Sequence, residues 1–91
     1  MKYTIQIQPQ AMKDLQKYKR SNPNAAKKLA KLFMELEEHP TTGTGHPEAL
    51  KGGNGITYSR RITANDRLIY NILNDVVIVD VIAVEGHYND K

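Results

Sequence analysis

The spacing of hydrophobic residues predicts a strand followed by two helices in the first 40 residues. Residues Lys2 to Gln8 alternate apolar and polar side chains, as a half-buried strand does. From Pro9 to about Arg20, apolar residues recur at helical spacing among several lysines. A longer helix is predicted to begin after the N-cap residue Asn22, with Pro23 in its first turn, and to end before Pro40.

The rest of the chain has the pattern of short strands joined by turns. Four strands are predicted, near His46 to Leu50, Ile56 to Thr63, Arg67 to Leu73 and Val76 to Val84. Glycines and the Asn74-Asp75 pair provide the turns between them. A strand, two helices and successive hairpins indicate an α+β domain, with both helices packed on one face of a small antiparallel β-sheet. The opposite face is then free to form a site.

Alternation within the strands predicts which side chains share that free face, because successive residues point to opposite sides. On the core face we expect Leu68, Tyr70 and Ile72 from one strand and Ile56, Tyr58 and Ile62 from another. The free face then carries Arg67, Ile69 and Asn71 beside Thr57, Ser59, Arg61 and Thr63. Arg61 and Arg67 are therefore expected in one groove. Arg60 falls on the core side, and we expect it to snorkel at a sheet edge.

Length and charge limit the kind of function that this chain can have. Its 91 residues suffice for a single domain, 1–91, with one modest core and a surface groove as its site. The 13 Lys and Arg against 10 Asp and Glu give a net charge of +3, which suits a polyanionic partner. Cysteine is absent, and no apolar run reaches the length of a membrane span. We expect a soluble, cytoplasmic protein with no membrane partner.

A carboxylate, several fixed cations and a late histidine form the candidate chemistry. The carboxylate of Glu48 could take the proton of a ribose 2'-hydroxyl, and the imidazole of His87 could protonate the departing 5'-oxygen. The guanidinium groups of Arg61 and Arg67 could hold the charge that builds on the phosphate oxygens. This combination predicts cleavage of RNA without a metal or any other cofactor.

Each of these residues also has a simpler interpretation. Glu48 alone is typical of a surface glutamate, and His87 is close enough to the C-terminus to be a frayed end residue. Tyr88 could stack on a base or cap the core, and Lys51 could bind phosphate or only flank a glycine-rich turn. His46 shares the strand parity of Glu48 and is a weaker candidate for the same groove.

Other site types fit the sequence less well. The three histidines lack a pair at ligand spacing and the carboxylates do not cluster, which argues against a metal centre. The glycines between Gly43 and Gly55 match no phosphate-binding or dinucleotide-binding fingerprint, because no helix follows them.

One set of motifs, in order along the chain, resembles a known family. Gly-x-Gly-x-Pro-Glu-x-Leu-Lys at 43–51, Ser-Arg-Arg-Ile at 59–62, Arg-Leu-Ile-Tyr at 67–70 and a final His-Tyr at 87–88 resemble the YoeB/Txe branch of the RelE/ParE toxin superfamily. The resemblance implies the RelE-like fold and a toxin of a type II toxin-antitoxin pair. Such toxins act as ribosome-dependent messenger RNA endonucleases that a cognate antitoxin protein holds inactive.

The resemblance also assigns roles to individual residues. Glu48 is implied as the general base, Arg67 as the transition-state clamp, His87 as the general acid and Tyr88 as the terminal aromatic partner. The expected substrate is mRNA on the ribosome, with Lys51 and Arg61 at positions that hold it, and with Arg60 and His46 as weaker candidates.

The chain departs from the branch in three places, and other functions stay open. The aromatic pair before Ser-Arg-Arg is Thr57-Tyr58, the segment from Arg67 to His87 is longer, and residues 89–91 extend past the His-Tyr. A ParE-like toxin acting on a topoisomerase and a non-catalytic RNA-binding module are the alternatives. A dimer and a toxin-antitoxin hetero-oligomer are the candidate assemblies.

Overall fold

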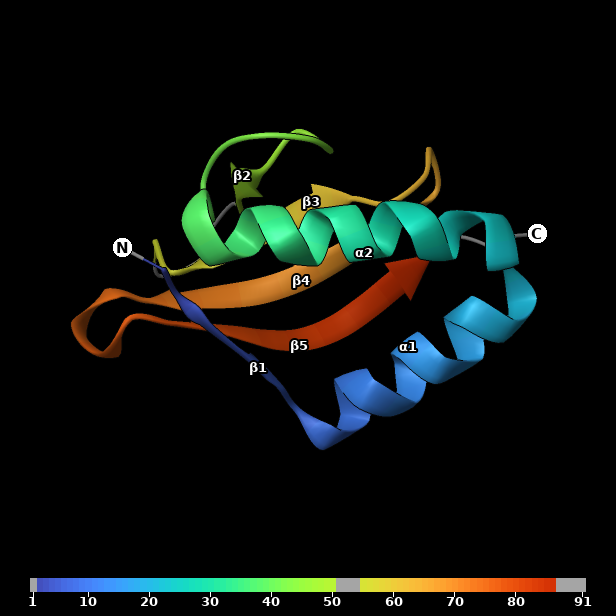
Figure 1. The fold of residues 1–91 in the computed structure, drawn as a ribbon, viewed down its shortest axis with the longest axis horizontal. Helices are drawn as coiled ribbons and strands as arrows, with labels where there is room; N and C mark the ends of the chain where they lie inside the picture. The colour runs from blue at the N-terminus through green and yellow to red at the C-terminus, as the bar shows by residue number, and fades with distance from the viewer. Residues whose placement is uncertain (1, 51–54, 87–91) are drawn as a thin grey trace.

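The N-terminal half folds as its hydrophobic spacing predicts. The computed structural model describes residues 2–50 and 55–86. Within them, strand β1 (Thr4–Ile7) leads into helix α1 (Pro9–Ser21), and helix α2 (Pro23–Glu38) follows (Figure 1). A proline stands in the first turn of each helix, where a missing N–H costs no hydrogen bond. Neither helix is long and apolar enough to cross a membrane in the described part of the chain.

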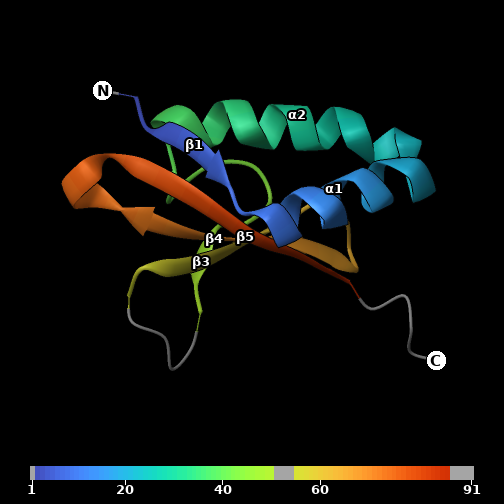
Figure 2. The ribbon, with the colours of Figure 1, turned by 90° about the horizontal axis from the view of Figure 1, so that it is seen from below.

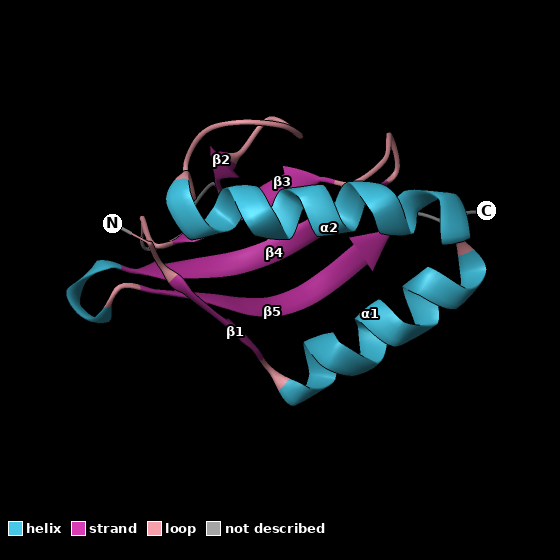
Figure 3. Ribbon diagram, viewed as in Figure 1, coloured by secondary structure: helices cyan, strands magenta, loops and turns pink. Residues whose placement is uncertain are grey.

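Five strands form one sheet beside these helices (Figure 3). The remaining strands are β2 (Glu48–Ala49), β3 (Thr57–Arg61), β4 (Asp66–Leu73) and β5 (Ile78–Gly86), and the order across the sheet is β1-β5-β4-β3-β2. All neighbours are antiparallel except β1 and β5, which run parallel. The prediction of an antiparallel sheet is therefore wrong for this pair, because alternation of side chains does not reveal strand direction.

Strand β2 is shorter than predicted, and His46 lies outside it. The backbone of His46 has a φ of 52°, in the left-handed region, so the chain becomes extended only after this residue. Glu48 pairs with Ser59 and Ala49 with Tyr58, and the Leu50 N–H donates to the Thr57 carbonyl over 3.0 Å. The catalytic candidate Glu48 thus lies on a two-residue edge strand.

The core lies between the helices and one face of the sheet. Figure 2 shows both helices on the same side of the strands. Helix α2 contributes Leu29, Leu32 and Leu36, and α1 contributes Ala11, Leu15 and Tyr18. The sheet contributes Leu68, Tyr70 and Ile72, as predicted, together with Ile62, Val79 and Val81. Each fully buried leucine stabilises the fold by about 1.5–3 kcal/mol.

Two predictions about the sheet faces need correction. Ile56 was expected in the core, but it precedes β3 and is 36% exposed. Ser59 and Ile69 lie on the face away from the helices as predicted, yet both are buried. That face is therefore open only in part.

Candidate functional site

Two arginines lie directly opposite each other on the face away from the helices. Arg61, at the end of β3, pairs with Arg67 of β4, and Arg67 pairs on its other side with Glu85 of β5. Residues paired in this way have Cα atoms about 4.5–5.5 Å apart. Arg61 is exposed and Arg67 half-buried, so both guanidinium groups are within reach of a polyanion. The prediction that these two arginines share the face away from the helices is confirmed.

Glu48 lies on the same face, in the neighbouring row of residues that are aligned across the strands. It pairs with Ser59, which is two residues before Arg61 on β3 and faces the same way. Glu48 and Arg67 are separated by two strand spacings of about 4.8 Å across the sheet and by two residues along it, which together amount to about 12 Å between their backbones. Glu48, which is exposed, and the two arginines therefore lie on the same face of neighbouring strands.

The remaining candidates divide into exposed and undescribed residues. His46 is exposed at the bend before β2. Lys51, His87 and Tyr88 lie outside the described residues. The last described residue, Gly86, precedes His87 in the sequence and pairs with Asp66, the neighbour of Arg67.

Arg60 is placed differently from the prediction. Its side chain is fully buried on the helix side of the sheet instead of snorkelling at an edge. Its Nη1 donates to the Glu35 carboxylate over 3.1 Å. Its Nη2 donates to the carbonyls of His39 and Thr42, each over 2.8 Å. The guanidinium group is thereby bound to helix α2 and the loop after it. We therefore leave Arg60 out of the proposed substrate surface.

Glu35 makes contacts with distant segments that the sequence did not reveal. Lys31, four residues earlier on the helix, is near enough for its charge to lower the pKa of Glu35, but the hydrogen bonds of Glu35 do not come from it. Instead, the Glu35 carboxylate accepts hydrogen bonds from the Thr44 N–H and the Thr44 hydroxyl, both over 2.8 Å, besides the one from Arg60. Its partners lie 9 and 25 residues away in the sequence, where no periodicity could point to them.

Burial and these hydrogen bonds act on the acidity of Glu35 in opposite directions. Burial alone raises the pKa of this carboxyl, but the hydrogen bonds from Thr44 and the charge of Arg60 outweigh it. The net result is a pKa below the usual range of a glutamate. Glu35 is therefore held as an anion that binds the loop in front of Glu48.

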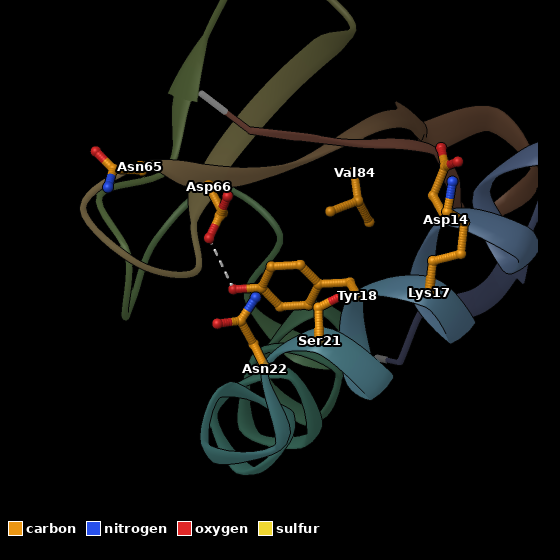
Figure 4. Close-up of a pocket in the computed structure, with 8 residues that line it drawn as sticks. All are labelled: Asp14, Lys17, Tyr18, Ser21, Asn22, Asn65, Asp66 and Val84. Atoms are coloured by element: carbon orange, nitrogen blue, oxygen red, sulfur yellow. Dashed lines mark hydrogen bonds between the residues drawn. The ribbon is translucent and has the colours of Figure 1, made fainter. Parts of the chain in front are cut away.

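A pocket of about 460 Å³ opens between helix α1 and the turn that joins β3 and β4 (Figure 4). The hydroxyl of Tyr18 on α1 donates a hydrogen bond to the Asp66 carboxylate over 3.0 Å, and both residues line the pocket. Val84 of β5 lies beside it, while Asp14 and Lys17 provide charges of both signs. None of the candidate residues Glu48, Arg61 and Arg67 lines this pocket, so the proposed site is the open sheet surface instead.

Residues 2–50 and 55–86 contain no cluster of side chains that could form a metal centre. No group of three or more histidine, cysteine, aspartate or glutamate side chains in these ranges is arranged to hold an ion.

Comparison with known proteins agrees with the fold and identifies the family of the chain. Residues 7–88 match the family described as the YoeB-like toxin of bacterial type II toxin-antitoxin systems. The chain is 30% identical over 74 residues to the toxin YoeB of Mycobacterium bovis, an alignment that covers 81% of this chain and 87% of that one.

Solved structures give the same assignment. A YoeB/ParE toxin from Agrobacterium tumefaciens superposes with a TM-score of 0.81 at 28% identity, covering 93% of this chain and 99% of that one. The YoeB-YefM complex from Staphylococcus aureus contains a chain that matches with a TM-score of 0.76 at 28% identity, covering 97% and 100%. The two helices on a mostly antiparallel five-stranded sheet are the architecture of these RelE-type toxins. The chain therefore belongs to the YoeB-like toxins of bacterial type II toxin-antitoxin systems.

Proposed function

We propose that this toxin is a ribosome-dependent mRNA endoribonuclease that works by metal-independent general acid-base catalysis. Glu48 takes the proton of a ribose 2'-hydroxyl, and the resulting oxygen attacks the adjacent phosphorus in line with the departing 5'-oxygen. Arg67 and Arg61 stabilise the charge on the phosphate oxygens, and His87 protonates the leaving group. The products are a 2',3'-cyclic phosphate and a 5'-hydroxyl end.

The observation that carries this proposal is the pairing of Arg61 with Arg67 next to the row that holds Glu48. Like charges directly opposite each other in a sheet are destabilising, so packing alone gives no reason for the pair. An anion placed between the two guanidinium groups removes the repulsion. A carboxylate one row away supplies the base that cleavage of a phosphodiester requires.

The partners follow from the same proposal. The substrate is mRNA on the ribosome, which puts the activity in the cytoplasm, and Lys51, Tyr88 and His46 add contacts to it. The inhibitor is a cognate antitoxin protein, as the YoeB-YefM complex of S. aureus exemplifies for its own toxin. The net charge of +3 favours an acidic antitoxin segment that folds as it binds.

The test is single-turnover cleavage of a defined mRNA on translating ribosomes, followed by analysis of the new ends. We expect 2',3'-cyclic phosphate and 5'-hydroxyl ends from the wild-type chain. Glu48→Gln keeps the size of the side chain but removes the base, and should slow cleavage by about 100-fold or more.

A matched control is Asp75→Asn, the same loss of charge at an exposed carboxylate in the turn between β4 and β5. It should cleave at the wild-type rate. New 3' ends that carry a plain hydroxyl group would overturn the mechanism, and an undiminished rate in Glu48→Gln would remove this residue from it.

A further inference from the structure

The position of Glu48 depends on a loop that has little regular structure of its own. Residues 39–47 connect α2 to β2, and β2 holds only two residues at the edge of the sheet. Two residue pairs and the bond from Leu50 to Thr57 attach this edge to β3. Catalysis needs reacting groups in place to well under 1 Å, a demand that so short an edge strand does not meet without support.

Buried polar groups on the helix side of the sheet provide this support. The guanidinium group of Arg60 binds the carbonyls of His39 and Thr42, which fixes the start of the loop. The hydroxyl of Tyr70 donates to the Pro40 carbonyl over 2.7 Å from within the core. These three loop carbonyls are thus held by side chains of β3 and β4, the strands that carry Arg61 and Arg67.

The carboxylate of Glu35 fixes the middle of the loop. It accepts from the Thr44 N–H at Oε1 and from the Thr44 hydroxyl at Oε2, and Arg60 Nη1 also donates to Oε1. Gly43 has a φ of +114°, and a Cβ there would collide with the Glu35 carboxylate, so the loop passes as close as its backbone allows. Gly45 then accepts a hydrogen bond from the Arg61 N–H over 2.7 Å.

General stability alone does not account for this arrangement. A buried ion pair often contributes no more than well-packed apolar residues of the same volume. Here the Arg60 Nε is also buried without a hydrogen-bond partner in the described structure, which adds a cost. What the pair provides is geometry, because a planar guanidinium and a carboxylate fix the direction of each bond.

We propose that Glu35, Arg60 and Thr44 are positioning residues that set the placement of Glu48 relative to Arg61 and Arg67. The inference rests on the proposed RNA-cleaving function, since it assigns these residues to the same site. They contact no substrate. Their bonds join the loop that carries Glu48 to the strands that carry the two arginines.

The variant that isolates this effect is Thr44→Val, which keeps the side-chain shape and removes the hydroxyl donor. Small misplacements of catalytic groups cost up to about 100-fold, so we expect the maximal single-turnover rate to fall about tenfold. The toxin concentration at half saturation should stay within about twofold, because Glu48 adds little to ground-state binding. Thr44→Ser should restore the rate, whereas Thr41→Val makes the same change at an exposed site in the loop and should have no effect.

A second measurement separates this inference from the proposed function. Amide hydrogen exchange at Leu50 reports the bond between β2 and β3, and Thr44→Val should speed it by about tenfold while exchange at Tyr70 stays unchanged. Unchanged exchange at Leu50 would overturn the positioning role. A variant whose toxin concentration at half saturation rises while its maximal rate stays unchanged would overturn it too. A wild-type chain that cleaves no RNA would instead refute the nuclease, and Leu50 exchange would still decide whether Thr44 anchors β2.

Discussion

Arg61 and Arg67 place two like charges directly opposite each other on neighbouring strands. Glu85, on the other side of Arg67, offsets part of the repulsion by facing one of the two cations. Parity within β3 and β4 was enough to predict that the arginines share a face, because it depends only on alternation along each strand. The position of Glu85 was not predictable in this way, since a register shift between β4 and β5 changes which residues face each other.

Removing one of these cations should stabilise the free toxin while it weakens function. We expect Arg61→Thr to raise the free energy of unfolding by about 0.2–1 kcal/mol at low salt, as relief of a directly opposed like-charge pair does. Urea unfolding at low and high ionic strength measures this. The gain should largely disappear at high salt, because exposed charges are then screened. A gain of equal size at high salt, or a loss at low salt, would show that the repulsion is absent.

Arg60 and Glu35 show where inference from the sequence stops. Alternation correctly placed Arg60 on the core side, but it says nothing about which partner lies there. The sequence likewise gives no sign that the Glu35 carboxylate binds a loop residue and a strand residue. Both cases have one cause: a polar contact between distant segments depends on the loop conformation, which no local pattern encodes.

Helices and long strands were predictable because each has a repeated apolar period. α1, α2, β4 and β5 follow their predicted segments to within about two residues at most ends. β2 was predicted in the right place but too long, because its two residues are too few for any period and its start depends on the positive φ of His46. The elements that form the core could therefore be predicted together with their ends, whereas the strand that carries Glu48 could be located but its ends could not.

Helix α1 is linked to the β3–β4 turn by the hydroxyl of Tyr18. Burial raises the pKa of Tyr18 to about 12, and the hydrogen bond to Asp66 and its negative charge add to the shift. Because the pKa is higher in the folded state than the usual 10.0, the folded chain binds the proton more tightly. The stabilisation is complete below pH 10 and is lost as the pH rises towards 12.

Unfolding of the wild-type chain and Tyr18→Phe across this range tests the link. At pH 7 the variant should lose about 1–3 kcal/mol, the usual contribution of a hydrogen bond to a charged acceptor. Between pH 10 and 12 the wild-type stability should fall more steeply, so the two curves approach each other. Tyr70 is present in both chains, so it cancels from the difference. Parallel curves over the whole range would contradict the assignment.

The molecule as a whole divides its two faces between stability and chemistry. Both helices cover one side of the sheet and enclose the core, and the candidate residues of β2, β3 and β4 lie on the other side. The buried side chain of Arg60 and the partly buried side chain of Glu35 bind the loop that passes between these two regions. The surface that we propose to bind RNA is thus built on strands whose opposite face is packed, which gives it a rigid base.

The most direct test of the proposed nuclease is primer-extension mapping of a defined mRNA incubated with the purified toxin. The reaction is run with and without translating ribosomes, beside Arg67→Ala. We predict discrete new 5' ends that form only with ribosomes and that decline by about 100-fold or more in the variant. Intact RNA in every reaction with folded wild-type toxin, or undiminished cleavage by Arg67→Ala, would contradict the account.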